Sequence, residues 1–542
     1  MRHADKTARL SRTGVRQAMG LFAALAVVFV ALAMPNRIET LKDPWFLAIP
    51  LEYPVLLLVL VLAPTSLRLA ARLAAGAMLV ALVILKAADM AVYFAFARPF
   101  NPLVDVTVIP TALETLAGTN GLWTVVGAVL GLAALLGALC SALYWALRAI
   151  QNLAPRRGIG VASTAGLIIA VMTPIGHADA TFFLRDHATR GAESLRAADE
   201  FRAALDQDEF HTIRPDRRLA GLAGTDVILI FVESYGRSTL DDPAYAPTIR
   251  ERLRQFGETL SAAGFSARSA WLTSSTYGGE SYLAHSSVLS GLWVDNQNRY
   301  ADLMTSRRRT LIDDFRDGGW RTVAVLPQIT RAWPEGAFFG YDQVYDSTNL
   351  GYEGRPFTYM TMPDQFTLAS FHAKELAAPN RPPVMAEIAL ISSHHPWTPI
   401  PKFVPWDQVG DGTVFNTART TETVDEAWST PERIRQNYVM TVDYTLETLM
   451  SFIATFGGDD MVFIVMGDHQ PPAFMARSDA RAVPVHIMAR DPTRLAVLGD
   501  GWAEGMTPTT DSPIAPMSSM RARIINAFAR PAPTNPTLAT AP

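Results

Sequence analysis

The sequence predicts a helical membrane region followed by an α/β domain with a mainly parallel sheet. The chain has 542 residues, which is more than one ordinary domain needs. Its composition is 49% hydrophobic and only 18% charged, and the apolar residues are crowded into the first third of the chain. From Asp226 onward, strand-like apolar runs alternate with helix-like stretches, which is the pattern of a βαβ sheet covered by helices.

Five apolar segments in the first third are predicted to be transmembrane helices. A helix needs roughly 20 apolar residues to cross the hydrocarbon core of a bilayer. The first segment follows a basic start and could also be a signal peptide, but the further spans favour a retained helix. The segments lie near residues 18–34, 53–69, 75–96, 122–147 and 160–173.

The basic residues predict how these spans are oriented. The amino-terminal segment and the second-to-third and fourth-to-fifth connections are basic, whereas the alternate loops carry acids and few basic residues. We therefore expect a multi-pass protein of the cytoplasmic (inner) membrane, with its N-terminus in the cytoplasm and its later residues periplasmic or extracellular. A transporter is less favoured because Lys86 and Asp89, expected to pair with each other, are the main intramembrane charges.

Composition and charge divide the chain into four parts. We expect a membrane domain at 1–176, a linker at 177–224, an outer α/β domain at 225–530 and a disordered, proline-rich tail at 531–542. Apolar spacing within the linker predicts a helix near 186–205, either amphipathic at the membrane surface or a plain connector. The net charge of −4 shows no basic footprint for nucleic acid. The single cysteine, Cys140, excludes an intramolecular disulfide and a cysteine metal cluster.

The outer domain is built around its first strand, where six apolar residues run directly into Glu233. A run this apolar is typical of a strand buried on both faces, and functional residues gather at the carboxyl ends of such strands. We predict strands at 227–232, 322–326, 384–392 and 461–466, and helices at 247–263, 282–289, 307–317 and 431–456.

Three of these strands end in residues that suit a metal ion. Glu233 ends the first, His394 and His395 follow the third, and Asp468 and His469 follow the fourth. Carboxylate and imidazole together favour a divalent ion such as Zn, Mn or Fe. Each pair alone is more often a loop or cap feature, so the prediction depends on their occurrence at several strand ends.

Ser281 is the candidate nucleophile. Two glycines shortly precede it and a helical pattern follows, which predicts that Ser281 begins a helix. The helix dipole and free N–H groups there favour an anion. A serine hydroxyl needs a base or a metal to become reactive. The alternative is that Ser281 only caps the helix.

At this point the sequence resembles a membrane-anchored member of the alkaline phosphatase/arylsulfatase superfamily, close to lipoteichoic acid synthases, phosphoglycerol transferases and phosphoethanolamine transferases. The resemblance rests on the five spans and on four short motifs. These are Phe-Val-Glu-Ser-Tyr-Gly at 231–236, Leu-Ser-Gly at 289–291, Ser-Ser-His-His-Pro at 392–396 and Gly-Asp-His-Gln at 467–470. It implies a sulfatase-like fold for the outer domain.

The resemblance implies roles for four residues. Glu233, Asp468 and His469 would bind one divalent metal ion (Mn, Zn or Mg), and Ser281 would be both nucleophile and fourth ligand. The family's transferases usually have threonine here, and Thr276 is therefore an alternative nucleophile.

The resemblance also implies which residues bind the substrate. His394, with His395 beside it, would bind the substrate phosphate, and Trp333 falls where lipoteichoic acid synthases have an aromatic residue for glycerol phosphate. Glu335 stands where those enzymes have arginine, which leaves that substrate open. His486 could be a further site residue or an ordinary strand residue.

The implied function is a metal-dependent phosphotransferase that moves a phosphoglycerol- or phosphoethanolamine-type headgroup from a membrane lipid to an envelope glycan or lipid acceptor through a phosphoserine. The alternatives are a phosphodiesterase, phosphatase or sulfuric-ester hydrolase on the same site, and a catalytically silent sensor. The outer domain lacks the Cys/Ser-x-Pro-x-Arg motif of formylglycine sulfatases at Ser281. The lack of disulfides favours the phosphoglycerol or teichoic-type branch.

Overall fold

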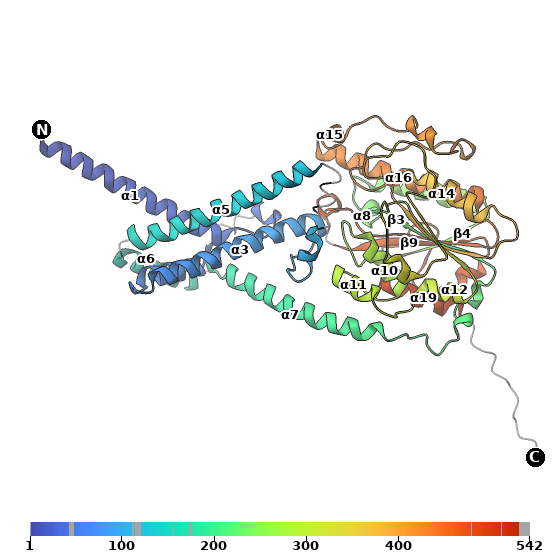
Figure 1. Cartoon of the computed structure of the whole chain (residues 1–542), viewed down its shortest axis with the longest axis horizontal. Helices are drawn as coiled ribbons and strands as arrows, with labels where there is room; N and C mark the ends of the chain where they lie inside the picture. The colour runs from blue at the N-terminus through green and yellow to red at the C-terminus, as the bar shows by residue number, and fades with distance from the viewer. Residues whose placement is uncertain are drawn as a thin grey trace, which may run out of the picture. The chain divides into compact units, whose positions relative to one another are not determined.

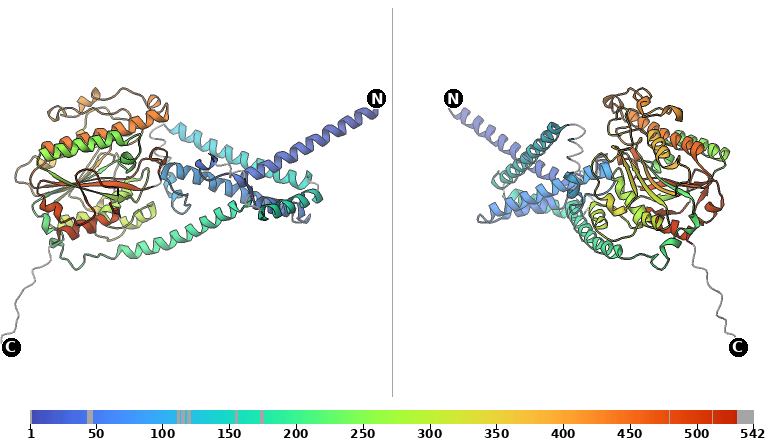
Figure 2. Two further views of the ribbon diagram at one scale, coloured as in Figure 1. Left: turned by 180° about the vertical axis from the view of Figure 1, so that it is seen from behind. Right: turned by 45° about the vertical axis from the view of Figure 1, so that its right-hand side comes forward.

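The computed structural model describes residues 2–42, 48–110, 113, 117, 121–153, 156–172, 176–478, 480–510 and 512–529. The chain divides into two compact units. The helical unit consists of Met1–Phe94 and Arg98–Ala197, and the sheet unit of Ala95–Ala97 and Ala198–Pro542. Figures 1 and 2 show mainly helices in the blue part of the chain and a sheet between helices in the green to red part. The expected tail at 531–542 lies outside the described residues.

Helices α1, α2, α3 and α5 pack around an apolar core in the helical unit. Val28, Leu60, Leu79 and Leu147 are buried there, one from each helix. The elements are α1 (Arg2–Ala33), η1 (Glu39–Lys42), β1 (Ile49–Pro50), α2 (Glu52–Leu62), α3 (Arg68–Phe96), η3 (Asp105–Val108), α5 (Leu122–Leu153), α6 (Arg156–Met172), β2 (Gly176–His177) and α7 (Asp179–Leu205), whose last turns belong to the sheet unit.

Three of the five predicted spans coincide with helices long and apolar enough to cross a membrane: Gly14–Ala33, Arg68–Phe96 and Leu122–Asn152. The second and fifth predicted spans fall on shorter apolar helices, Glu52–Leu62 and Gly158–Ile168, so a count of five is not confirmed. Helix α2 ends two residues before Pro64, because the residue that precedes a proline disfavours helical backbone angles.

The expected pair of Lys86 and Asp89 does not form, because each side chain has other partners. Lys86 Nζ donates to Leu32 O at 2.8 Å. Asp89 accepts from Asn36 Nδ2 at 2.9 Å, and His187 Nε2 lies 3.1 Å from its other oxygen. Both side chains are buried, so these polar contacts offset the cost of removing them from water.

The sheet unit has two helical layers around one sheet. Its strands are β3 (Asp226–Val232), β4 (Ser266–Thr273), β5 (Arg321–Leu326), β6 (Gln343–Asp346), β7 (Val384–Leu390), β8 (Met461–Gly467), β9 (Ala482–Ala489), β10 (Ala503–Glu504) and β11 (Ile514–Pro516). Its α-helices are α8 (Ser238–Asp241), α9 (Ala246–Ala262), α10 (Ser281–Ser290), α11 (Gln297–Met304), α12 (Leu311–Asp317), α13 (Gly336–Phe339), α14 (Asp364–Phe371), α15 (Val424–Ala427), α16 (Pro431–Phe456), α17 (Ala473–Ala476), α18 (Thr493–Ala496) and α19 (Met520–Phe528). Short turns of other helix types are η4 (Pro215–Arg217), η5 (Ala220–Leu222), η6 (His372–Leu376), η7 (Trp406–Gln408), η8 (Thr413–Asn416) and η9 (Met517–Ser519).

The sheet is mostly parallel, as predicted. Its strand order is β10-β4-β9-β8-β3-β7-β5-β6, with β11 on β4. Strand β3 pairs in parallel with β7 on one side and β8 on the other, whereas β9 runs antiparallel to β8. Alternate residues of β3 enter two different cores. Ile228 and Ile230 pack with α9, α14 and α16, and Leu229 and Phe231 pack with α10, α12 and α19 (Figures 1 and 2).

The three central strands deliver their carboxyl ends to one edge of the sheet. The loops after β3 and β8 touch there: a Cβ on Gly467 would lie 1.9 Å from Tyr235 O, and one on Gly236 would lie 2.0 Å from Gln470 Oε1. Only glycine permits so close an approach. The backbone therefore brings the residues that follow β3 and β8 together.

A buried carboxylate fixes the start of the loop after β7. Asp364, the first residue of α14, accepts hydrogen bonds from Ile391 N at 2.7 Å and from Ser392 N at 3.0 Å. Its second oxygen accepts from Thr445 Oγ1 at 2.7 Å. The loop that carries His394 is therefore held by a side chain from a different part of the sequence.

Replacing Asp364 with alanine is expected to lower the free energy of unfolding by about 2–4 kcal/mol, because two buried N–H groups lose their acceptor. Equilibrium denaturation of the detergent-solubilised protein measures the change. Asp411→Ala is the control, because Asp411 makes similar bonds to Thr413 at the surface, where water can replace them, so the free energy of unfolding should fall much less. Equal losses in the two variants would contradict the anchoring role of Asp364.

Candidate metal centre and nucleophile

Glu233, Asp468 and His469 form a buried cluster at the carboxyl edge of β3 and β8. One ligand atom of each residue lies within 4.8 Å of the other two. His469 Nε2 is 3.5 Å from Glu233 Oε1 and 3.6 Å from Asp468 Oδ2. The spacing leaves the three ligand atoms facing one another around a common centre, which is the arrangement that a divalent ion requires.

The electrostatics of the cluster favour a bound cation. Burial and the neighbouring Glu233 raise the pKa of Asp468 to about 6. Burial also acts to raise the pKa of Glu233, but His469, His394 and hydrogen bonds from Ser234 and Ser281 hold it below its usual value. Burial alone would lower the pKa of His469, whereas Asp468 and Glu233 raise it. Two carboxylates that compete for one histidine's charge would be stabilised by a divalent ion.

Backbone and side-chain bonds leave the right atoms available to a metal. Asp468 Oδ1 accepts from Ser234 N at 2.8 Å and from His469 N at 2.6 Å, which leaves Oδ2 for a ligand. His469 Nδ1 lies 2.7 Å from Gln470 O and donates to it, so the Nε2 lone pair faces the cluster. The donor set of two carboxylates and one imidazole therefore fits the ion that the sequence implies, and Mn, Zn and Mg all accept such ligands.

The structure brings Ser281 to this cluster. Ser281 is the first residue of α10, and Glu280 before it turns the chain with a positive φ of 60°. The Ser281 hydroxyl donates to Glu233 Oε2 at 3.1 Å and lies 3.2 Å from His469 Nε2. The Thr276 hydroxyl instead donates to Gly279 O at 2.5 Å within the preceding loop. Of the two candidate nucleophiles, only Ser281 contacts the cluster in the described structure.

His394 and His395 lie in the loop after β7, next to the cluster. His394 stacks on Tyr359 with ring centroids 4.2 Å apart and on His395 at 4.3 Å. The charge of His394 is close enough to lower the pKa of Glu233. His394 is half-buried and His395 is exposed, so both can be reached by a substrate.

Trp333 and His486 make no hydrogen bond, ion pair or ring contact with the cluster in the part of the chain that the structure describes. Trp333 is half-buried, and its ring packs on Phe339 with centroids 5.9 Å apart. His486 is fully buried in β9, with Nδ1 2.7 Å from Ser269 Oγ, and burial lowers its pKa to about 3. The geometry of His486 is that of a neutral histidine satisfied within the sheet.

Sequence reasoning missed a buried polar group beneath the nucleophile helix. His285, one turn after Ser281, donates from Nδ1 to Glu387 Oε1 at 2.8 Å and stacks on Phe231 at 3.8 Å. The Tyr341 hydroxyl donates to the second oxygen of Glu387. A glutamate in the middle of the otherwise apolar strand β7 is the signal that could have revealed this group.

We expect metal affinity to rise with pH, because protons on Asp468, whose pKa is about 6, and on His469, whose pKa is raised, compete with the ion at lower pH. Isothermal titration of the metal-free protein with Mn²⁺ or Zn²⁺ at several pH values measures this. Glu233→Gln should weaken binding at every pH, since it removes one ligand charge. The exposed Glu335→Gln is the matched control and should bind as the wild type does. A pH-independent affinity would contradict the assigned ligands.

Comparison with solved structures finds similar chains with different activities. The lipoteichoic acid synthase LtaP from Listeria monocytogenes is 14% identical, with a TM-score of 0.39 over 61% of this chain and 78% of that chain. The phosphoglycerol transferase GacH from Streptococcus pyogenes is 12% identical, with a TM-score of 0.37 over 63% and 81%. The zinc complex of the periplasmic domain of EcEptC from Escherichia coli is 14% identical, with a TM-score of 0.35 over 55% and 80%.

At such identities the activities of these proteins do not transfer to this chain. No curated protein matches the sequence. The family model for the sulfatase family matches residues 225–494, which include Glu233, Ser281, Asp468 and His469. Residues 225–494 therefore form a domain of the sulfatase family.

Proposed function

We propose that this protein is a membrane-bound, metal-dependent phosphotransferase that uses Ser281 as its nucleophile. It would move a phospholipid headgroup, of the phosphoglycerol or phosphoethanolamine type, from a membrane lipid to a glycan or lipid acceptor of the cell envelope. The observation that carries the proposal is the position of the Ser281 hydroxyl, which is 3.1 Å from Glu233 and 3.2 Å from His469 at the start of α10. A serine whose only role was to cap the helix would not have to lie beside this cluster.

Each residue of the site has its own role in the first half of the proposed reaction. Glu233, Asp468, His469 and the Ser281 oxygen would hold the ion, which supplies positive charge that makes the serine oxygen nucleophilic and stabilises the phosphoryl oxygens. Ser281 Oγ forms a bond to phosphorus while the bond to the diacylglycerol oxygen breaks, and that oxygen takes up a proton. The first N–H groups of α10 and the imidazole of His394 are placed to bind the negative phosphoryl oxygens.

The second half of the reaction reverses the first with a different alcohol. A hydroxyl of the acceptor attacks the phosphorus of phospho-Ser281, the serine Oγ–P bond breaks, and the proton of the acceptor returns to the serine. Glu233 Oε2 accepts a hydrogen bond from the serine hydroxyl in the free enzyme and is placed to do so again at this step. If water takes the place of the alcohol, the same residues give a hydrolase.

The helical unit would keep the enzyme at the membrane that contains its lipid substrate. Three helices long and apolar enough to cross a membrane precede the sulfatase-family domain. We place this domain on the periplasmic or extracellular side of the cytoplasmic membrane, because the basic connections of the helical unit favour a cytoplasmic N-terminus. Anchoring an enzyme to the membrane that holds its substrate raises the effective concentration of that substrate.

Ser281→Ala should abolish covalent capture of phosphorus, because no other hydroxyl of the site contacts both Glu233 and His469 among the described contacts. The assay incubates the full-length protein with phosphatidylglycerol or phosphatidylethanolamine labelled in the headgroup phosphate, and measures label on the denatured protein. Adduct formation is expected to fall at least about 1,000-fold, as when a catalytic nucleophile is removed.

Two variants are controls for this assay. Ser286→Ala lies on the same helix, and its hydroxyl only donates back to Tyr282 O at 2.7 Å, so capture should persist. Thr276→Ala tests the alternative nucleophile and should also retain the adduct. Loss of the adduct in Thr276→Ala together with its retention in Ser281→Ala would show that the nucleophile is assigned wrongly.

Removal of the metal should abolish capture in the wild type without unfolding the protein. Dialysis against a chelator withdraws the ion from Glu233, Asp468 and His469, and addition of Mn²⁺ or Zn²⁺ should restore adduct formation. Circular dichroism checks that the fold is retained, since the cluster occupies one edge of a sheet with a large apolar core of its own. Full activity in the presence of chelator would exclude metal dependence.

A further inference from the structure

The last two turns of α7 pack against the nucleophile helix. Phe201 and Leu205 of α7 share a buried apolar cluster with Leu283 of α10 and Tyr300 of α11. Leu283 stands two residues after Ser281 and is fully buried. Side chains of α7 and of the amino-terminal turn of α10 therefore belong to one apolar cluster within the sheet unit.

Arg308 joins the carboxyl ends of the same two helices. Its Nε donates to Ser290 O, the last residue of α10, at 3.0 Å. Its Nη1 donates to Ala204 O in the last turn of α7 at 3.4 Å and also to Gln207 O just beyond. The final carbonyl groups of a helix have no partner within the helix, and one guanidinium satisfies such groups on both helices here.

Arg308 makes these bonds at a considerable cost. Its side chain is buried, and no ion pair joins it to a carboxylate in the described part of the chain. Burial lowers the pKa of its guanidinium, and the nearby positive charge of Arg521 lowers it further. A buried cation with only neutral acceptors is unfavourable compared with an apolar side chain of the same size. The benefit that Arg308 provides is the link between helix ends.

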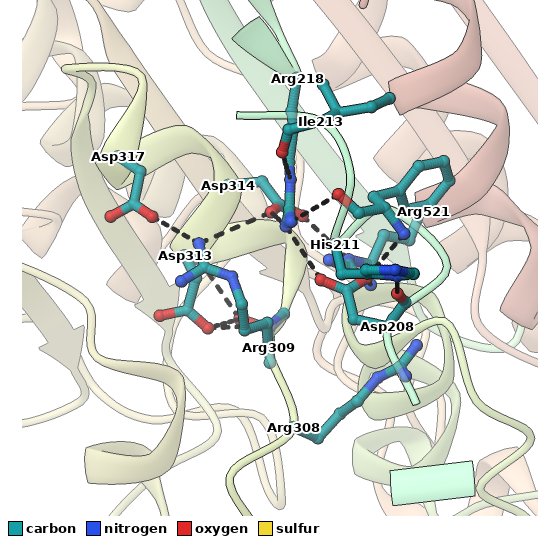
Figure 3. Close-up of polar contacts among 12 residues, drawn as sticks. Asp208, His211, Ile213, Arg218, Arg308, Arg309, Asp313, Asp314, Asp317 and Arg521 are labelled. Carbon is teal, nitrogen blue, oxygen red and sulfur yellow. Dashed lines mark hydrogen bonds and ion pairs between the residues drawn. The ribbon is translucent and has the colours of Figure 1, made fainter. Parts of the chain in front are cut away.

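A neighbouring network of charges fixes the segment that leaves α7 (Figure 3). Asp314 of α12 accepts from Arg218 Nη1 at 2.7 Å and from Arg521 Nε at 2.9 Å, and all three side chains are buried. Asp208 lies 3.1 Å from Arg218 and 3.3 Å from Arg521. Because Gln207 precedes Asp208, an acceptor of Arg308 is anchored to α12 and α19.

The proposed chemistry is sensitive to the exact placement of α10. Ser281 lies at one end of this ten-residue helix and Ser290 at the other, so a shift at the carboxyl end tilts the nucleophile. A displacement of about 1 Å at a reacting group can cost about 100-fold in rate. The contacts of the Ser281 hydroxyl, at 3.1 and 3.2 Å, leave little tolerance for such a displacement.

We propose that Arg308 is a positioning residue for the nucleophile: with Phe201, it clamps α10 against the end of α7 and so holds the Ser281 hydroxyl at the metal cluster. The inference rests on the proposed function in that Ser281 is taken as the nucleophile. It goes beyond that function because it makes the end of the connecting helix a part of the catalytic machinery.

The test compares Arg308→Lys with the wild type as full-length proteins in phospholipid nanodiscs. Lysine keeps the charge but cannot bridge several carbonyl groups in fixed directions. The single-turnover rate of adduct formation from phosphatidylglycerol or phosphatidylethanolamine labelled in the headgroup phosphate, taken per folded and metal-loaded molecule, should fall about 10- to 100-fold. The half-saturating lipid concentration and the Mn²⁺ affinity should change by a smaller factor than the rate, because Glu233, Asp468, His469 and His394 keep their places and only α10 moves.

Two controls accompany these measurements. Arg309→Lys changes the next residue, which pairs with the surface residue Asp317 at 2.5 Å and more distantly with Asp314 at 3.7 Å, and should leave the rate unchanged. Phe201→Leu keeps an apolar side chain while reducing the packing of the cluster that contains Leu283, and should slow adduct formation by a smaller factor. If Arg308→Lys does not fold, the rate of adduct formation in Phe201→Leu tests the proposal instead. Arg202→Ala, on the same turn of α7, is the control for that variant. A wild-type rate in the folded Arg308→Lys protein overturns the proposal.

Hydrogen exchange separates failure of this inference from failure of the proposed function. Amides of 281–290 should exchange faster in Arg308→Lys than in Arg309→Lys, whatever reaction the site catalyses, because α10 loses its clamp. If the wild type captures no label from either lipid, the proposed function is wrong. The hydrogen-exchange result alone then tests whether Arg308 holds α10 in place. If the wild type captures label and α10 exchanges equally in both variants, the clamp is wrong and the function stands.

Discussion

Two buried carboxylates lie side by side at one edge of the sheet, and the free energy needed to keep them there is the constraint on which the site depends. Glu233 and Asp468 share one histidine and no arginine or lysine among their described contacts. Two negative charges that are buried away from water are stable only if a cation binds between them or a proton neutralises one of them. The raised pKa of Asp468 is the sign of this conflict, and a divalent ion resolves it. The strand order β8-β3-β7 creates the conflict, because it brings these strand ends together.

The sequence predicted the cluster well because its members follow strands directly. Glu233 and Asp468 end long apolar runs, and in a parallel sheet the ends of neighbouring strands meet. The helix start at Ser281 was predicted from similar local signals, since glycines precede it and a helical pattern follows it. The mainly parallel sheet, the long helix α16 and three of the spans were predicted for the same reason: each is encoded by a continuous pattern of apolar residues.

Features that depend on contacts between distant segments could not be predicted. Lys86 and Asp89 have spacing that suggests a pair, yet Leu32, Asn36 and His187 offer them better partners from other helices. Arg308 has no sequence signal, because its acceptors lie about a hundred residues earlier and eighteen residues earlier along the chain. Trp333 lies in a loop whose course is set by packing on Phe339, which periodicity does not describe.

The nucleophile helix itself explains why positioning residues are needed. Isolated helices shorter than about 12–15 residues are marginal in water, and α10 has ten residues. Ser286, Ser287 and Ser290 donate to carbonyl groups four residues earlier, so their small polar side chains are satisfied within the helix but add little apolar contact. The place of α10 is therefore set by its neighbours: Glu387 hydrogen-bonds His285, Phe201 shares an apolar cluster with Leu283, and Arg308 hydrogen-bonds Ser290 O. Tertiary contacts that fix α10 also hold Glu280, the residue before Ser281, at its strained φ of 60°, which so short a helix could not impose by itself.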